Sequence, residues 1–261
     1  MKINDIKAVF FDIDGTLFDH FENKVWDSTI KAIELLRKKG IKVILCSGRP
    51  KEMADELNFL DKFEYDGYIG CSGGQIFDEN NKLIYDNLYS DLQLKQIFDI
   101  ADKYKYVAIS FGKYKFATRE LDKNSKLLVE EFHLVIDEIR KWNHERLTAV
   151  SVVIPDGCSS EMFNNIEGLS YHRSTSYCID FICDHVNKAL GIKQMLNYLN
   201  LDNASFLAFG DSENDIPMFE AATISFCMEN GAIKAKEKAD YIIGPSNSNT
   251  IYETLKSFKL I

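Results

Sequence analysis

The chain has 261 residues, 46% of them hydrophobic, and its formal net charge is −9. This length allows a full hydrophobic core in one large domain or two smaller ones. The negative charge disfavours nucleic acid as a partner, because binding a phosphate backbone rests on clustered Lys and Arg. No apolar run reaches the ~20 residues of a membrane span, and acidic residues interrupt the N-terminal segment where a signal peptide needs an apolar core. We therefore expect a globular cytoplasmic protein with no membrane partner.

The first predicted strand is "AVFF", from Ala8 to Phe11, and the polar segment "DIDGT" follows it directly. Strand side chains alternate between faces, so Asp12 and Asp14 would point to the same side at the end of this strand. Two carboxylates this close repel each other and raise each other's pKa unless a cation or a proton lies between them. The segment therefore predicts a positively charged partner.

Two further apolar strands end abruptly in polar residues. Residues 28–40 predict an amphipathic helix with Ser28 as its N-cap, and the next segment, "IKVILC", predicts a short buried strand that ends before Ser47 and Gly48. The segment "ASFLAFG" predicts a third strand, followed by Asp211 and another helix. Strands that alternate with helices favour a parallel sheet, in which the carboxyl ends of the three strands can converge.

The middle of the chain has a different pattern. The segment "GYIGCSGGQIFDENNKLIYDN" predicts a strand and a hairpin that turns at Asn80 and Asn81. The strands that follow are adjacent along the chain, which favours an antiparallel sheet covered by helices on one face. We therefore expect an α/β protein with a Rossmann-like parallel-sheet core, residues 1–82 and 185–261, and an inserted α+β cap domain, residues 83–184.

The cysteines and histidines give no sign of a metal site. The cysteines lie in apolar segments without a C-x-x-C pair, so we expect buried free thiols. The histidines share no metal-ligand spacing, and we assign none of them a role. The residues in question are Cys46, Cys71, Cys158, Cys178, Cys183 and Cys227, and His20, His133, His144, His172 and His185.

The aspartate pair belongs to a larger set of polar residues at predicted strand and helix ends. An isolated D-x-D pair is a weak signal, since most such pairs are solvated turn carboxylates. Here Asp12 and Asp14 are accompanied by Ser47, Lys188 and Asp211. A carboxylate can attack phosphorus, a hydroxyl and an ammonium can hold phosphate oxygens, and further carboxylates can bind Mg²⁺. The set therefore has the members that phosphoryl transfer needs.

In these motifs the chain resembles the haloacid dehalogenase-like superfamily of aspartate-nucleophile phosphotransferases. The resemblance covers the whole chain and rests on "DIDGT", "SGR", Lys188 and "GDSEND", in that order. The insert is similar to the type IIB cap of the Cof-like sugar-phosphate phosphatases. The resemblance implies that Asp12 is a nucleophile that becomes an aspartyl phosphate. It implies that Asp14 is the general acid and base, while its backbone carbonyl ligates Mg²⁺.

The same resemblance implies roles for the other residues of the set. The residues that would bind the phosphoryl group are Ser47, Gly48, Lys188 and Asn214. Those that would hold Mg²⁺ are Asp12, Asp14 and Asp211, and Asp215 would complete the site around them.

Three positions depart from the family pattern. Ser47 replaces a usual Thr before Gly-Arg-Pro and keeps the hydroxyl. "SGG" at residues 72–74 replaces the usual Asn-Gly-Ala. The family's Lys is commonly followed by Gly, whereas Ala189 follows Lys188 here.

The resemblance implies a Mg²⁺-dependent phosphatase that hydrolyses small phosphorylated metabolites, sugar phosphates in particular. Two alternatives stay open: a phosphomutase, in which a sugar hydroxyl takes the phosphoryl group, and a non-catalytic sugar-phosphate-binding protein. Arg119 and Arg173 lie in polar breaks of the insert's predicted strands and are candidates to contact the substrate. The sequence leaves the substrate's identity and the oligomeric state open.

Overall fold

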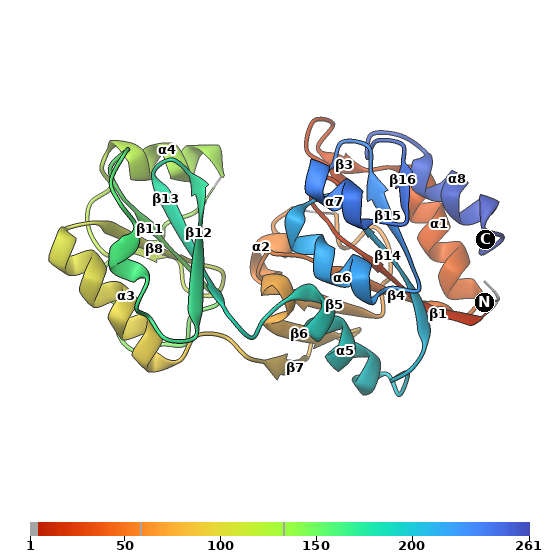
Figure 1. The fold of residues 1–261 in the computed structure, drawn as a ribbon, viewed down its shortest axis with the longest axis horizontal. Coiled ribbons are helices and arrows are strands. Elements are labelled where there is room, and N and C mark those ends of the chain that lie inside the picture. The colour runs from red at the N-terminus through yellow and green to blue at the C-terminus, as the bar shows by residue number, and fades with distance from the viewer. Residues whose placement is uncertain (1–4, 58, 133) are drawn as a thin grey trace. The chain divides into compact units, whose positions relative to one another are not determined.

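The computed structural model describes residues 5–57, 59–132 and 134–261. The first four residues of the N-terminal segment considered above, and His133, lie outside the described residues. The described chain forms two compact units. The first unit consists of the residues up to Asp86 together with Asn187–Ile261, and the second is Asn87–Val186. Each unit has its own large sheet (Figure 1).

The first unit is built on an eight-stranded sheet. In spatial order its strands are β16 (Tyr241–Ile243), β15 (Ile224–Met228), β14 (Ser205–Gly210), β1 (Ile6–Phe11), β4 (Lys42–Cys46), β5 (Gly67–Gly70), β6 (Gln75–Asp78) and β7 (Leu83–Asp86). The strands from β16 to β5 pair in parallel, and β6 and β7 continue the sheet in antiparallel pairing. The chain proceeds outward from β1 through β4 and from β14 through β15, so the strand order reverses between β1 and β14.

Helices cover both faces of this sheet. Val9 and Phe11 of β1 belong to a core cluster with α1 and α8. Ala8 and Phe10 belong to a second cluster with α5, α6 and α7, on the opposite face because strand side chains alternate. These helices are α1 (Asp27–Lys38), α5 (Lys188–Tyr198), α6 (Ile216–Ala221), α7 (Ile233–Lys238) and α8 (Thr250–Ser257), and a short α2 (Lys51–Asp55) follows β4. Figure 1 shows α1 and α8 side by side. The expected α/β core with a parallel sheet is confirmed.

The hairpin that turns at Asn80 and Asn81 belongs to the first unit. Asn81 has a positive φ of 60°, and β7 pairs with β6 across the turn. The second unit therefore begins at Asn87 and not at Leu83, because residues 83–86 continue the large sheet.

The first helix does not begin with the expected cap. The N-cap residue of α1 is Trp26, which makes no side-chain cap hydrogen bond. Ser28 lies inside the first turn, and its Oγ donates to Oδ1 of Asn249 at 2.7 Å. The hydroxyl thus joins α1 to the start of α8.

The second unit is built on a six-stranded sheet. In spatial order its strands are β10 (Glu138–Ile139), β9 (Phe116–Ala117), β8 (Val107–Phe111), β11 (Ala149–Val153), β13 (Cys178–Cys183) and β12 (Leu169–Thr175). Only the pair β9–β10 is parallel among these described strands. The unit also contains α3 (Asp91–Tyr104), α4 (Lys123–Glu131) and the 3₁₀ turn η3 (Glu161–Phe163). No helix in the described part of the chain is long and apolar enough to cross a membrane.

The two helices of this unit pack on opposite faces of its sheet. Phe98 of α3 packs in a cluster with Val152, whereas Leu128 of α4 packs in another with Val153. Val152 and Val153 are neighbours on β11 and point to opposite faces. The expectation that helices cover one face alone is therefore wrong, since the apolar run of β11 is buried on both sides.

The side chain of Asp66 connects β4 to α1. Its Oδ2 accepts hydrogen bonds from the Val43 amide (3.0 Å) and from Arg37 Nε (3.1 Å), and its Oδ1 accepts one from Lys42 Nζ (2.9 Å). Burial alone would raise the pKa of Asp66, but these hydrogen bonds and the charge of Arg37 outweigh it and lower the pKa. The carboxylate is therefore more strongly stabilised in the folded state than in the unfolded chain.

We expect Asp66→Asn to lower the free energy of unfolding at pH 7 by about 1–3 kcal/mol, because charge-assisted hydrogen bonds are lost. A lowered folded-state pKa stabilises the protein above the unfolded pKa, and this contribution is lost as the pH falls through the folded pKa. The difference between wild type and variant in urea unfolding should therefore shrink below about pH 4. Asp61→Asn, at an exposed position of the same loop, is the control. A difference that stays constant at lower pH would contradict this account.

Candidate active site

Three strand ends meet at the point where the strand order reverses. Asp12 follows β1, Ser47 follows β4 and Asp211 follows β14, and these three strands are parallel neighbours. Phe11 pairs with Phe209, and the Asp12 amide donates to the Phe209 carbonyl at 2.8 Å, so β1 and β14 end level with each other. The sheet thus brings together at its carboxyl edge residues that lie far apart in the sequence.

Lys188 is buried between two carboxylates. Its Nζ lies 2.5 Å from Oδ1 of Asp12 and 2.5 Å from Oδ1 of Asp215, and its side chain is 0% exposed. Lys188 is the first residue of α5, where the Asn187 side chain accepts a cap hydrogen bond from the Leu190 amide. Burial would lower the pKa of Lys188, but the two carboxylates raise it far above its ordinary value. The ammonium is therefore charged at any physiological pH.

Two glycines allow α5 to come close enough for this contact. Gly73 has a φ of +107° in the turn η2 (Cys71–Gly73), and a Cβ there would collide with the Asn187 carbonyl. A Cβ on Gly191 would lie 2.8 Å from the Gly73 Cα. Gly73, which the Ser-Gly-Gly of residues 72–74 shares with the family pattern, thus fits the helix that carries Lys188, and the Ala after Lys188 leaves its contact with Asp12 intact.

Asp211 is held against the segment that follows β1. Thr16 Oγ1 donates to Oδ1 of Asp211 at 3.0 Å. Gly15 has a φ of +77°, and a Cβ there would lie 2.6 Å from Oδ2 of the same carboxylate. The Gly-Thr of the first motif therefore has a local explanation: the glycine makes room for Asp211 and the threonine orients it.

The carboxylates of this site fit a divalent cation. Asp12, Asp211 and Asp215 each offer an oxygen, and these oxygens lie within 4.8 Å of one another. Burial raises the pKa of Asp12 well above its usual range and the pKa of Asp211 to about 6, and repulsion from the neighbouring carboxylates adds to both shifts. Hard cations such as Mg²⁺ take oxygen ligands and would relieve this repulsion.

Asp215 already has partners for both of its oxygens. Lys188 bonds Oδ1, and the amides of Asp211 and Ser212 donate to Oδ2 at 2.8 and 2.9 Å. We therefore infer that Asp12 and Asp211 are the carboxylates with capacity for a metal ion. Asp215 fixes the loop after β14 and the position of Lys188.

Two polar side chains, those of Asn214 and Ser72, lie close to the Cα of Gly48. A Cβ at this position would lie 3.4 Å from Asn214 Nδ2 and 3.5 Å from Ser72 Oγ. Ser47 is fully buried, and its Oγ accepts a hydrogen bond from the Arg49 amide at 3.0 Å. The structure thus places the residues expected to bind phosphate, Ser47, Gly48, Lys188 and Asn214, around the same strand ends.

The carboxylate of Asp14 has partners of its own and is not part of the acidic cluster. Arg49 donates from Nε to Oδ2 (2.8 Å) and from Nη2 to Oδ1 (2.9 Å), and His20 Nε2 lies 2.7 Å from Oδ1. Burial alone would raise the pKa of Asp14, but hydrogen bonds from His20 and Arg49, and the charge of Arg49, lower it to about 2. Asp12 and Asp14 therefore do not depend on one shared cation, because each has a separate cationic partner.

Arg49 and His20 were not expected as site residues. Arg49 belongs to the "SGR" segment, in which only Ser47 and Gly48 were predicted to have roles. His20 was dismissed as a lone histidine, and its contact arises from the hairpin of β2 (Phe18–Asp19) and β3 (Lys24–Val25). Strands of two residues carry no periodicity that a sequence could reveal.

The two arginines predicted to contact substrate lie in the second unit. Arg119 Nη2 is 2.6 Å from Oδ1 of Asp102, and Arg173 donates to the carbonyls of Ser176 (2.8 Å) and Cys158. Both side chains thus bind groups of their own unit, and a role toward substrate stays a prediction.

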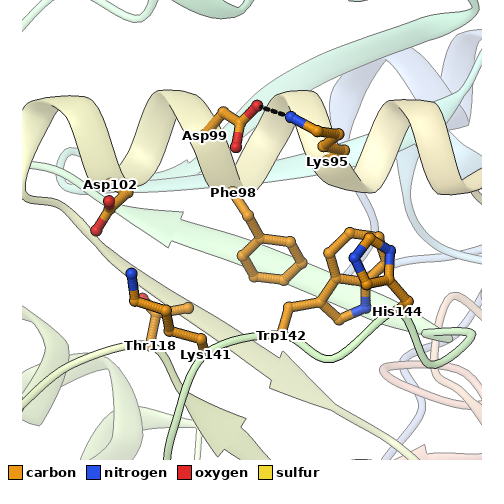
Figure 2. A pocket seen from close by; sticks show the side chains of 8 residues that line it. All are labelled: Lys95, Phe98, Asp99, Asp102, Thr118, Lys141, Trp142 and His144. Carbon is orange, nitrogen blue, oxygen red and sulfur yellow. Dashed lines mark hydrogen bonds and ion pairs between the residues drawn. The ribbon is translucent and has the colours of Figure 1, made fainter.

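A pocket of about 200 Å³ opens in the second unit between α3 and the segment that contains Trp142 (Figure 2). Phe98 and Trp142 stack at 5.3 Å and form its apolar part. Lys95 and Asp99, one helical turn apart, pair with each other at its rim at 2.5 Å. Because this charge pair is satisfied internally, we assign the phosphoryl chemistry to the strand ends and not to this pocket.

All six cysteines are among the described residues, and none forms a disulfide. Four of them are buried, whereas Cys71 and Cys158 are half-buried. Burial raises the pKa of Cys46, which lies near the site, to about 12, so this thiol stays protonated. The expectation of free thiols is confirmed, and the expectation that they are buried holds for four of the six.

Comparisons with known proteins place this chain among phosphatases. The family model described as haloacid dehalogenase-like hydrolase matches residues 9–255. Phosphoglycolate phosphatase 1 of Saccharolobus solfataricus is 26% identical over 250 residues, which cover 95% of this chain and 93% of that protein. A 5-amino-6-(5-phospho-D-ribitylamino)uracil phosphatase of Bacillus subtilis is 26% identical over 263 residues, which cover 98% of this chain and 97% of that protein.

Solved structures agree with the fold. A phosphatase of the haloalkanoate (HAD) enzyme superfamily from Bacteroides thetaiotaomicron has a TM-score of 0.87 and 24% identity, covering 98% of this chain and 96% of that chain. A HAD subclass IIB sugar phosphatase has a TM-score of 0.81 and 25% identity, covering 98% of this chain and 100% of that chain.

We expect Lys188→Met to lower the free energy of unfolding by about 3–5 kcal/mol, because it leaves two buried carboxylates without their cation. The loss should be largest at neutral pH and smaller at lower pH, where protonation of Asp12, whose pKa burial raises, removes part of the buried charge. Urea unfolding in the presence of a chelator measures both. Lys193→Met, exposed on the same helix, is the matched control and should change stability by less than about 0.5 kcal/mol. Equal effects of the two substitutions would refute the structural role of Lys188.

Proposed function

This chain belongs to the haloacid dehalogenase-like hydrolases and is a phosphatase. We propose that it hydrolyses phosphate monoesters of small metabolites, sugar phosphates in particular, in a Mg²⁺-dependent reaction through an aspartyl phosphate on Asp12. The observation that carries the proposal is the contact of Lys188 with Asp12 at the strand ends, beside Asp211. The likeness to a solved HAD subclass IIB sugar phosphatase supports the substrate class.

Asp12 is the proposed nucleophile. The ammonium of Lys188 holds Oδ1 of Asp12 and favours the ionised carboxylate despite its burial. The other oxygen of Asp12 would attack phosphorus and form the acyl phosphate, while the leaving alcohol departs with a proton from Asp14. The groups that would hold the phosphoryl oxygens are the Ser47 hydroxyl, the Gly48 backbone, the Lys188 ammonium and the Asn214 amide.

The carboxylates of Asp12 and Asp211, with the backbone carbonyl of Asp14, would hold Mg²⁺. Bound there, the ion would offset the repulsion between Asp12 and the anionic substrate. Thr16 supports this arrangement by orienting Asp211, and Asp215 supports it by fixing the loop that carries Asp211.

Asp14 needs two protonation states during one cycle. In the structure it is ionised and bound by Arg49 and His20, which suits the second half-reaction, in which it would take a proton from the attacking water. In the first half-reaction it would have to carry a proton to the leaving oxygen; with that proton on Oδ2, the hydrogen bond from Arg49 Nε must loosen, while the bonds from Arg49 Nη2 and His20 to Oδ1 can persist.

The second unit, Asn87–Val186, is the part of the chain that we propose selects the leaving group. The same position in the sequence is occupied by the cap of the family that the chain resembles. Arg119 and Arg173 remain candidates for this selection, and a cytoplasmic location remains our prediction for the enzyme.

We expect phosphate release from hexose phosphates to stop in excess chelator and to return with Mg²⁺. Ca²⁺ should support little turnover, because its longer and more flexible coordination would misplace Asp12. A screen of phosphorylated metabolites by phosphate assay checks the metal and the substrate class together, with Asp12→Asn as the inactive control. Full activity in chelator would overturn the metal requirement, and phosphate release by Asp12→Asn would overturn the nucleophile.

We expect Asp14→Ala to release p-nitrophenol from p-nitrophenyl phosphate in a burst of about one equivalent per enzyme molecule, followed by slow turnover. The p-nitrophenolate anion leaves without an acid, whereas attack of water on the aspartyl phosphate lacks its base. A hexose phosphate, whose alkoxide is a poor leaving group, should give no comparable burst.

Rapid-mixing absorbance measurements detect the burst, and mass spectrometry of the quenched protein detects the phosphorylated Asp12. Steady turnover of both substrates at the wild-type rate would show that Asp14 is not the acid and base.

A further inference from the structure

His20 contacts Asp14 from a small hairpin that is fixed to the core. Its ring packs edge-on against Phe18 with ring centroids 5.0 Å apart, and Phe18 in turn stacks on Phe59 at 5.0 Å. Phe18 and Phe59 are both 1% exposed. The imidazole ring therefore packs against the hydrophobic core, while its Nε2 lies 2.7 Å from Oδ1 of Asp14.

The turn beyond His20 is held by its own contacts. The Asp19 carboxylate accepts hydrogen bonds from the amides of Phe21 (2.9 Å) and Glu22 (3.4 Å). The backbone of Gly15 donates to the Phe18 carbonyl at 3.0 Å, so the hairpin is joined to the segment that carries Asp14. The contact between His20 and Asp14 thus follows from the local fold and does not depend on a freely moving surface side chain.

Two side chains, Arg49 and His20, donate hydrogen bonds to the Asp14 carboxylate, and they differ in exposure. Arg49 binds both oxygens of Asp14, and its side chain is 26% exposed. Its backbone is also fixed, because its carbonyl accepts hydrogen bonds from Tyr68 Oη (2.9 Å) and the Cys71 amide (3.1 Å). The His20 side chain is 53% exposed. His20 is therefore the donor that can be substituted with less disturbance of the core, since about half of its side chain is exposed.

We propose that His20 is a positioning residue for Asp14, and that its Nε2–H, together with Arg49, holds the carboxylate in the orientation from which it reaches the leaving-group oxygen. This inference rests on the proposed function. It assigns no proton transfer to the imidazole; Asp14 alone would contact the substrate.

The test compares leaving groups that do and do not need Asp14. We expect His20→Ala to lower the first-turnover rate of alcohol release from a hexose phosphate roughly tenfold, the value of a hydrogen bond to a charged group. The first turnover of p-nitrophenyl phosphate should change by less than about twofold, because that leaving group needs little acid. The KM for each substrate should stay near the wild-type value.

Two variants separate positioning from general damage. His20→Gln should restore most of the hexose phosphate rate, because its side-chain NH₂ can donate where Nε2 donates. Phe21→Ala, at a 90% exposed position in the same turn, should leave both rates unchanged. Thermal unfolding of each variant establishes that the fold is intact.

The inference would be overturned if His20→Ala lowered the first-turnover rates of the hexose phosphate and of p-nitrophenyl phosphate equally. It would also be overturned if His20→Gln did not restore the hexose phosphate rate. If the wild type released phosphate from none of the esters, the proposed function would fail first and this inference with it. An active wild type with an unaltered His20→Ala variant would overturn the role of His20 alone.

Discussion

The buried ammonium of Lys188 is the interaction on which the site depends. It contacts Asp12 and Asp215 and is fully withdrawn from solvent. Burying one charge without a partner would cost several kcal/mol. The three groups therefore stabilise one another, and removing any one of them would leave a buried charge that destabilises the fold. This requirement explains why parts of the chain as distant as β1, α5 and the loop after β14 must meet at one place.

Small residues make that meeting possible. Lys188 reaches Asp12 because Gly73 and Gly191 let α5 approach the turn after β5. Asp211 takes its position because Gly15 has no Cβ to collide with its carboxylate. These three glycines are thus explained by close approach: Gly73 and Gly191 by that of two backbone segments, and Gly15 by that of the Asp211 carboxylate.

The sequence predicted the strand ends because each apolar run there stops at a polar residue, and parallel topology forces such ends to one edge. It predicted Asp12, Ser47 and Asp211 at that edge for this reason, and the structure confirms their proximity. Lys188 was included in the set for its place at a predicted helix start, but its contact with Asp12, 176 residues away in the chain, leaves no local pattern.

Other features depended on contacts that leave no local pattern. The partners of Asp14 are a histidine in the turn after a two-residue strand and an arginine in a loop, and neither has a periodic signal. The placement of α4 on the second face of its sheet was also missed, because a strand with apolar residues on both faces does not show which side is covered by which helix. The Ser28 hydroxyl was assigned to a helix cap, but a tertiary partner, Asn249, binds it instead.

The first motif places two aspartates one residue apart in opposite electrostatic environments. Burial raises the pKa of Asp12, whereas Arg49 and His20 hold that of Asp14 near 2. Groups with different chemical tasks are often separated in this way, by environment and not by residue type. For Asp12 the consequence is a need for cations, which Lys188 meets in part and a metal ion would complete. For Asp14 the consequence is the reverse: Arg49 already binds its carboxylate, so its work as an acid depends on how readily Arg49 Nε releases Oδ2.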